Sequence, residues 1–148
     1  MIDRYEHTQI GYLGIIVLTI GAVFIAYLMR IYGFNWTAFV VLIILGVCLL
    51  LFATLTVLIE KNILEIRFGT DIIRMRISLK DIESCQIVKN PWYYGWGIRL
   101  TPHGWLYNVS GFYAVEIKLK TGKRYRIGTD VPNELLESIQ ESIKRIVP

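Results

Sequence analysis

An almost uncharged stretch near the start of the chain constrains its fold most. The 50 residues from Ile10 to Ile59 carry a single charge, Arg30, and 39 of them are apolar or aromatic. A bilayer core about 30 Å thick is crossed by roughly 20 apolar residues of helix. Residues 10–29 and 31–59 each supply at least that many uncharged positions. We therefore predict two membrane spans, at about residues 10–29 and 36–58.

The link between the two predicted spans is short, which makes them an antiparallel hairpin. Positive residues near span ends set orientation, because Lys and Arg are retained on the cytoplasmic side. The link offers only Arg30 and the leader only Arg4, whereas four positive residues follow the second span: Lys61, Arg67, Arg74 and Arg76. We therefore expect both termini in the cytoplasm. The spans contain no Asp, Glu, Lys, Arg or His, which favours an anchor over an ion or proton path.

The remainder of the chain, residues 60–148, has the pattern of a soluble domain. Apolar residues alternate with polar ones, as in half-buried strands. Pro132 and the apolar residues after it, at three- and four-residue spacing, indicate a C-terminal amphipathic helix. The predicted strands are residues 64–68, 73–79, 82–88, 96–100, 105–109, 113–119 and 124–128. The chain thus divides into a transmembrane hairpin, residues 1–59, and a cytoplasmic domain, residues 60–148.

Seven antiparallel strands capped by a helix are the layout of the pleckstrin-homology (PH) superfold, and several segments are closer still to one family. Over about residues 55–146 the chain resembles the bacterial PH-like family, whose members often follow one or two membrane helices. The matching segments are Ser78–Ser84, Gly95–Arg99, Gly104–Gly111, Val115–Lys123 and Ile127–Leu135. The resemblance implies a seven-stranded antiparallel β-barrel or sandwich with a C-terminal helix, in the cytoplasmic membrane of a prokaryote. It implies no shared catalytic residues, and relatives that assemble into rings.

The residue inventory argues against an enzyme and against a metal or organic cofactor. The two histidines, His7 and His103, have no nucleophile and acid at motif spacing. Cys48 falls in a predicted span and Cys85 in a predicted strand, so no zinc-ligand pair forms. No glycine-rich phosphate loop or small-molecule substrate site is evident. The acidic C-terminal helix and the membrane anchor argue against nucleic-acid binding.

Basic residues provide one candidate binding site. Residues 60–148 hold 14 Lys and Arg against 10 Asp and Glu, whereas residues 1–59 hold two of each. Near an anionic leaflet, each surface cation contributes about 1 kcal/mol to membrane attraction. Arg67, Arg74 and Arg76 lie on the first predicted hairpin of the domain, where PH domains that bind phosphoinositides place their basic residues. These three arginines are the candidate sensor of anionic lipid headgroups.

An aromatic loop provides the other candidate. Trp92, Tyr93, Tyr94 and Trp96 fall in an irregular segment, where burying every ring is difficult. Exposed rings of this kind insert into the headgroup layer or form a patch for another protein. We therefore predict a non-catalytic membrane-anchored scaffold that contacts the bilayer surface, a protein partner or further copies of itself through residues 92–96. The lipid-headgroup sensor is the alternative.

Overall fold

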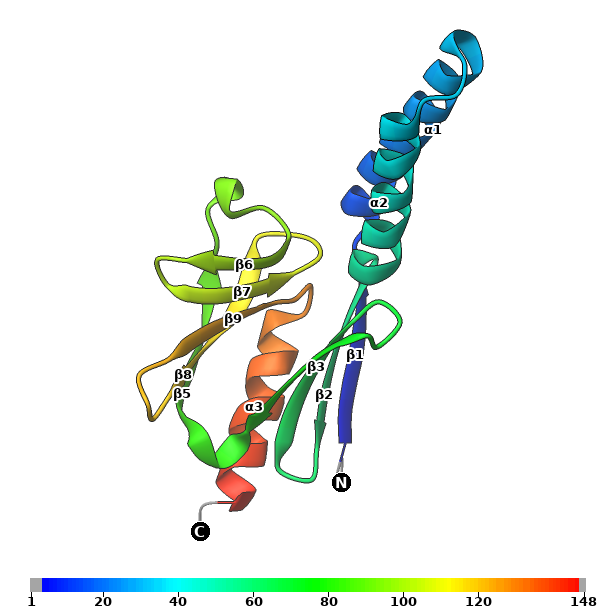
Figure 1. Cartoon of the computed structure of the whole chain (residues 1–148). Helices are drawn as coiled ribbons and strands as arrows, with labels where there is room; N and C mark the ends of the chain where they lie inside the picture. Colours follow the sequence, from blue (N-terminus) through cyan, green and yellow to red (C-terminus); the bar gives the residue numbers. More distant parts are fainter. Residues whose placement is uncertain (1–3, 147–148) are drawn as a thin grey trace.

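The computed structural model describes residues 4–146 and shows a pair of long helices standing on a domain of two sheets (Figure 1). The helices are α1 (Tyr12–Tyr32), α2 (Trp36–Phe52) and α3 (Pro132–Ile146), with short 3-10 turns η1 (Leu79–Asp81) and η2 (Trp92–Tyr94). The strands are β1 (Arg4–Ile10), β2 (Thr54–Glu60), β3 (Ile63–Phe68), β4 (Ile73–Ser78), β5 (Ile82–Lys89), β6 (Gly97–Thr101), β7 (Gly104–Asn108), β8 (Tyr113–Leu119) and β9 (Arg124–Gly128).

The structure supports one of the two predicted spans by length and composition. Within residues 4–146 one helix, α1, has the length and apolar character needed to cross a membrane. The second helix, α2, is apolar but has 17 residues and ends at Phe52, so it does not reach the predicted Leu58. It begins at a side-chain cap, because the Asn35 Oδ1 accepts a hydrogen bond from the Ala38 amide at 3.1 Å.

The first sheet, sheet A, has the order β1-β2-β3-β4 and is antiparallel throughout. The residues of β2 were predicted as helix from their hydropathy alone. They are rich in β-branched side chains, which favour strands, and Leu55, Val57 and Ile59 alternate into the core. No strand was predicted over β1, because its alternating residues are polar or charged on both faces.

The second sheet, sheet B, has the order β5-β8-β9-β7-β6, and its β7–β9 pair is parallel. All seven segments predicted as strands are strands, but the predicted fold class is wrong. The described residues form nine strands in two separate sheets of four and five, not one seven-stranded antiparallel barrel following a two-helix hairpin. The two additional strands are β1, which directly precedes α1 in the sequence, and β2, which directly follows α2. Their residues were assigned to the leader and to the second span.

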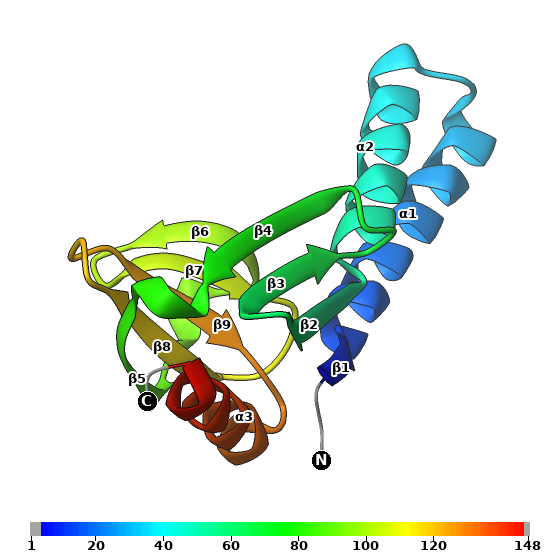
Figure 2. The same cartoon turned by 90° about the horizontal axis from the view of Figure 1, so that it is seen from below.

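The core lies between the two sheets and is closed by α3, which contacts β5, β8 and η1 (Figures 1 and 2). Leu135 and Ile139 of α3 are completely buried in the core. Sheet A contributes Leu64, Ile66 and Phe68 to it; sheet B contributes Val115, Ile117 and Ile127. The amphipathic stripe predicted for the C-terminal helix therefore covers the core, as expected from its spacing.

The base of the helical pair is held tightly against both sheets. The Gly11 amide donates to the Ala53 carbonyl at 2.7 Å, which joins the start of α1 to the end of α2. A Cβ on Gly11 would lie 2.7 Å from the Val109 carbonyl, and one on Gly69 2.1 Å from the Leu50 carbonyl. Both glycines therefore permit backbone contacts that a larger residue would push apart. The helical pair is fixed to the sheets rather than tethered by a linker.

Candidate functional site

The predicted aromatic contact segment divides into an exposed half and a buried half. Trp92 and Tyr93 are 78% and 65% exposed, and their rings pack edge-to-face at 5.9 Å. Tyr94 is buried, and its ring lies 6.3 Å from the His103 ring in the β6–β7 turn. Trp96 is partly buried, and its Nε1 is inaccessible to solvent with no hydrogen-bond partner. Trp92 and Tyr93 are therefore the rings of this segment that are largely exposed to a partner or a membrane.

A buried ion pair fixes the start of this aromatic segment. On the outer face of sheet B, Arg126 Nε donates to Glu116 Oε2 at 2.9 Å. Arg126 also donates to the Asn90 Oδ1 at 2.8 Å, while the backbone N–H of Asn90 donates to the Phe112 carbonyl at 2.6 Å. Asn90 immediately precedes Pro91 and η2. The aromatic turn is thus held at Asn90 on one side and at buried Tyr94 on the other.

The aromatic turn and the helical pair project in the same direction. In Figure 1, η2 is the short coil above β6, and it rises from sheet B toward the side on which α1 and α2 extend. Both described ends of the chain, together with the β2–β3 turn, lie at the opposite end of the domain. The exposed rings of Trp92 and Tyr93 therefore belong to the helical side of the molecule.

The predicted basic site lies on the outer face of sheet A, where its charge is partly neutralised. Arg67 Nε donates to Glu65 Oε1 at 2.5 Å, and Arg76 Nε donates to Glu65 Oε2 at 3.1 Å. Arg67 also lies 3.8 Å from Asp71, whose carbonyl accepts a bond from Arg74 Nε at 2.9 Å. Three arginines against two carboxylates leave a net charge of +1. The Arg67 hydrogen bond, and then the charges of Arg67 and Arg76, lower the pKa of the Glu65 carboxyl, so this carboxylate stays ionised beside them.

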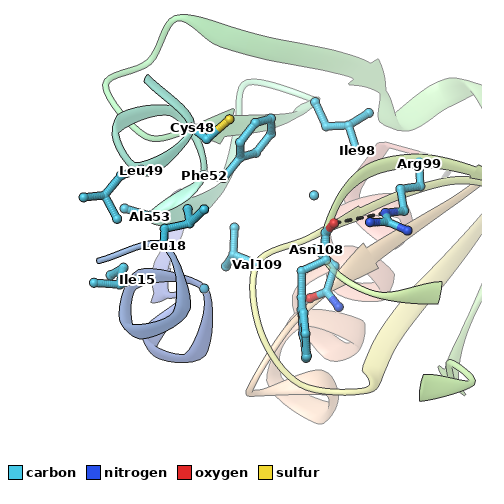
Figure 3. A pocket seen from close by; sticks show the side chains of 13 residues that line it. Ile15, Leu18, Cys48, Leu49, Phe52, Ala53, Ile98, Arg99, Asn108 and Val109 are labelled. Carbon is cyan, nitrogen blue, oxygen red and sulfur yellow. Dashed lines mark hydrogen bonds between the residues drawn. The ribbon is translucent and has the colours of Figure 1, made fainter. Parts of the chain in front are cut away.

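A groove lies where the base of the helical pair meets sheet B (Figure 3). Its volume is about 420 Å³, within the range of small-molecule sites. We call it the hairpin groove; its walls include Gly14 and Leu18 of α1, Cys48 and Phe52 of α2, Ile98 and Arg99 of β6, and Val109. These residues come from distant parts of the chain, so no sequence pattern joins them. Sequence reasoning did not find this groove.

The two histidines and the two cysteines lie on different parts of the fold. His7 Nε2 lies 2.6 Å from Asp130 Oδ1, a contact that joins β1 to the start of α3. Cys48 and Cys85 are free thiols, and burial raises the pKa of the Cys85 thiol. In the described part of the chain, no group of three or more His, Cys, Asp or Glu side chains is placed to hold a metal ion.

Comparison with models of known protein families found no match for this chain, and comparison with curated proteins found none either.

Proposed function

We propose that the protein is a membrane-anchored, non-catalytic binding module whose helical pair lies in lipid and whose aromatic turn contacts the same membrane. The observation that carries this proposal is the exposure of the two helices. Neither α1 nor α2 contains a buried residue, and apolar side chains cover their outward surfaces. Soluble domains rarely expose continuous apolar surface of this extent.

The strand pairing at the base supports insertion of the two helices together. β1 precedes α1, β2 follows α2, and the two strands pair from Arg4 opposite Glu60 to Ile10 opposite Thr54. The chain therefore enters and leaves the helical pair on the same side of the membrane. If α1 crosses the bilayer, α2 must return through it.

The two helices differ in how well their lengths match the thickness of the bilayer core. At 1.5 Å per residue, α1 is about 32 Å long and α2 about 25 Å, against a bilayer core of about 30 Å. Local thinning of the bilayer accommodates such a difference at modest cost. At the hairpin tip, the exposed rings of Tyr32, Phe34 and Trp36 are of the type that favours the headgroup layer.

The side of the membrane follows from charge and from the family resemblance. Arg30 is the single positive residue of the tip, whereas the two sheets and α3 carry most of the Lys and Arg of the chain. We place the domain at the inner face of the cytoplasmic membrane of a prokaryote, with both termini in the cytoplasm. The bacterial PH-like resemblance supports the prokaryotic assignment, although the sheet arrangement differs from the barrel that it implied.

Trp92 and Tyr93 would contact the headgroup layer around the anchor. Amphipathic rings favour this layer, and η2 presents them on the helical side of the domain. The alternative, headgroup sensing by Arg67, Arg74 and Arg76, is less favoured because Glu65 already pairs with two of these guanidinium groups. The predicted docking of a protein partner, or of further copies of the chain, stays a prediction.

Alkaline carbonate extraction of full-length protein from native membranes tests the anchor. The wild-type chain should stay in the membrane fraction. The double variant Val23→Arg and Ile44→Arg places one charge near the middle of each helix, at about 2.5 to 3.5 kcal/mol per residue, and should be extracted. Tyr32→Arg, at the exposed tip, is the control and should stay in the membrane. Release of the wild-type chain without detergent would refute the proposal.

Fluorescence quenching in liposomes tests the aromatic turn. The Trp36→Phe background removes the indole at the hairpin tip, and lipids brominated near the headgroup then quench the remaining tryptophans. Trp92→Phe should abolish most of the quenching, whereas Trp105→Phe, which removes a half-exposed indole on β7, should preserve it. Equal quenching with and without Trp92 would show that η2 does not touch the membrane.

A further inference from the structure

The hairpin groove combines walls of two different kinds. One wall is the base of the helical pair, where Leu18, Cys48 and Phe52 present apolar atoms (Figure 3). The opposite wall is the start of β6, with Ile98 and Arg99, and the end of β7. The groove is therefore continuous with the apolar surface of the helices on one side and with the domain on the other.

Arg99 gives the groove an uncompensated positive charge. Its Nε donates to the Trp96 carbonyl at 3.2 Å, and no acidic side chain of residues 4–146 forms an ion pair with it. Arg67, Arg76, Arg124 and Arg126 each lie within 4.0 Å of a carboxylate, whereas Arg74 also forms no ion pair with the described residues but lies outside the groove. In Figure 3 the Arg99 guanidinium lies at the edge of the groove away from the helices. An arginine in this setting is suited to a phosphate, which accepts two parallel hydrogen bonds from a guanidinium.

Trp96, which also lines the groove, carries a hydrogen-bond donor without a partner. Its Nε1 is a donor only, and this atom is buried without a partner although the residue lines the groove. A buried donor left unpaired destabilises the folded state, so an acceptor supplied by a ligand would be favourable. The groove thus offers apolar walls and one free positive charge, and the Trp96 side chain that lines it carries an unpaired donor.

We propose that the hairpin groove binds one anionic phospholipid, with an acyl chain between the helical base and β6 and the phosphate at Arg99. The inference rests on the proposed function, since the lipid would enter from the leaflet in which the helical pair lies. It goes beyond a general affinity for the membrane surface, because it assigns a particular lipid class to a particular arginine. Charge complementarity between Arg99 and the phosphate favours a lipid over an apolar peptide.

Photo-crosslinking in nanodiscs tests the inference on the full-length chain. The probes are phosphatidylglycerol and phosphatidylcholine, each with a diazirine in the acyl chain and each tested separately at the same fraction. Phosphatidylglycerol should label peptides containing residues 96–99 or 108–109, and phosphatidylcholine should label them less. Losing one charge-assisted contact changes affinity by about tenfold, so Arg99→Gln should lower the phosphatidylglycerol labelling of these peptides to a comparable extent.

Arg74→Gln is the matched control for charge. Arg74 and Arg99 each donate from Nε to the backbone carbonyl three residues earlier, at 2.9 and 3.2 Å. Arg74 belongs to the alternative headgroup site on sheet A and lies outside the groove. Its substitution should leave labelling of residues 96–99 unchanged. If Arg74→Gln lowers this labelling and Arg99→Gln does not, the inference is wrong and the anionic lipid is held by sheet A.

A matched pair of glycine substitutions tests the acyl-chain part of the groove. A Cβ on Gly14 or on Gly46 meets no atom within 4 Å, so a larger residue can be introduced at either position without a steric clash at its Cβ. Gly14 lines the groove and Gly46 does not. Gly14→Leu should reduce labelling at residues 96–99 with both lipids, and Gly46→Leu should not. Equal labelling in the two variants would contradict the inference.

The labelling pattern separates this inference from the proposed function. Labels on the outward helix residues, such as Phe24 and Val41, without labels on β6 or β7 would preserve the anchor and overturn the groove. No label anywhere would overturn both. Crosslinks between two copies of the chain at β6, in place of lipid adducts, would overturn the lipid assignment in favour of self-association, since β6 is an edge strand of sheet B.

Discussion

The outer faces of the two sheets carry the same chemistry in two different environments. On sheet A, Glu65 lies opposite Arg76 in the β3–β4 register and also pairs with Arg67. On sheet B, Glu116 lies opposite Arg126 in the β8–β9 register. The two glutamates are equally buried, with side chains 10% and 8% exposed, but the arginines differ: Arg67 and Arg76 are 26% and 62% exposed, whereas Arg126 is 8% exposed.

The difference shows that a cross-strand ion pair takes its role from what covers it. Within residues 4–146 no side chain joins the pair on sheet A as Asn90 joins the pair on sheet B, and the partly exposed guanidinium groups of Arg67 and Arg76 are screened by water. On sheet B, the segment leading into η2 lies over the pair, and Asn90 accepts from Arg126. There the ion pair is a structural support that positions the exposed rings of Trp92 and Tyr93.

The largest expected effect comes from breaking the pair on sheet B. Removing one partner of a buried ion pair leaves an uncompensated buried charge, so Glu116→Ala should lower the free energy of unfolding by about 3 to 5 kcal/mol. The matched change on sheet A, Glu65→Ala, should cost less, because Arg67 and Arg76 are partly exposed and their charges can be solvated once the carboxylate is gone. Chemical denaturation of the detergent-solubilised chain, followed by circular dichroism, measures both.

Equal losses in these two variants would contradict the comparison. They would mean either that the face of sheet A is more protected than its exposure indicates or that water reaches Arg126. The double variant Glu116→Met and Arg126→Leu tests whether the ion pair stabilises the fold through its packing or through its charges. An apolar pair of similar volume often replaces a buried ion pair without loss of stability.

A smaller effect is expected from loosening the aromatic turn without touching the ion pair. Tyr94 is 9% exposed, so Tyr94→Ala should destabilise the chain by up to about 3 kcal/mol, the low end for loss of a buried ring. It should also reduce quenching of Trp92 by headgroup-brominated lipid, because η2 loses one of its two attachments. Tyr93→Ala removes an exposed ring and should change stability by no more than about 0.5 kcal/mol. Undiminished Trp92 quenching in Tyr94→Ala would show that Asn90 alone fixes the turn.

The smallest expected effect is a pH dependence that comes from Glu65 on sheet A. The pKa of Glu65 is lowered in the folded chain, so the folded state binds this proton less readily than the unfolded state. The contribution of Glu65 is therefore complete above the ordinary glutamate pKa of about 4.3 and is lost as the pH falls through the folded value. Glu65→Gln should flatten the acid limb of a plot of stability against pH, and Glu83→Gln, at an exposed pair on β5, is the control. An unchanged acid limb would remove Glu65 as its source.

Much of the sheet domain follows from local pattern. Alternation predicted the seven strand segments after residue 60, because half-buried strands require a period of two. The errors concentrate at β1 and β2. Hydropathy alone assigned residues 54–58 to a helix, although Thr54, Thr56 and Val57 favour a strand. β1 has no apolar alternation that a sequence pattern could reveal. It is stabilised instead by pairing with β2 and by contacts such as that of His7 with Asp130.

The candidate sites were predictable to a lesser degree. The aromatic segment was identified from its composition, but composition does not distinguish exposed Trp92 from buried Tyr94. The arginines of sheet A were identified as a basic site, but their pairing with Glu65 depends on strand register. Arg99 was not identified at all, because what distinguishes it is its position beside the groove, which the fold assigns.

The sequence by itself determined that residues 10–52 are too apolar and too poor in charge for an ordinary water-exposed surface, and that the later residues form strands and one amphipathic helix. These properties depend on the composition and spacing of neighbouring residues. Only the tertiary structure decided that β1 and β2 pair at the base of the helical pair, that the arginine is buried in one Glu–Arg pair and exposed in the other, and that a groove forms beside Arg99. Each of these depends on contacts between residues far apart in the chain, whose geometry no local pattern encodes.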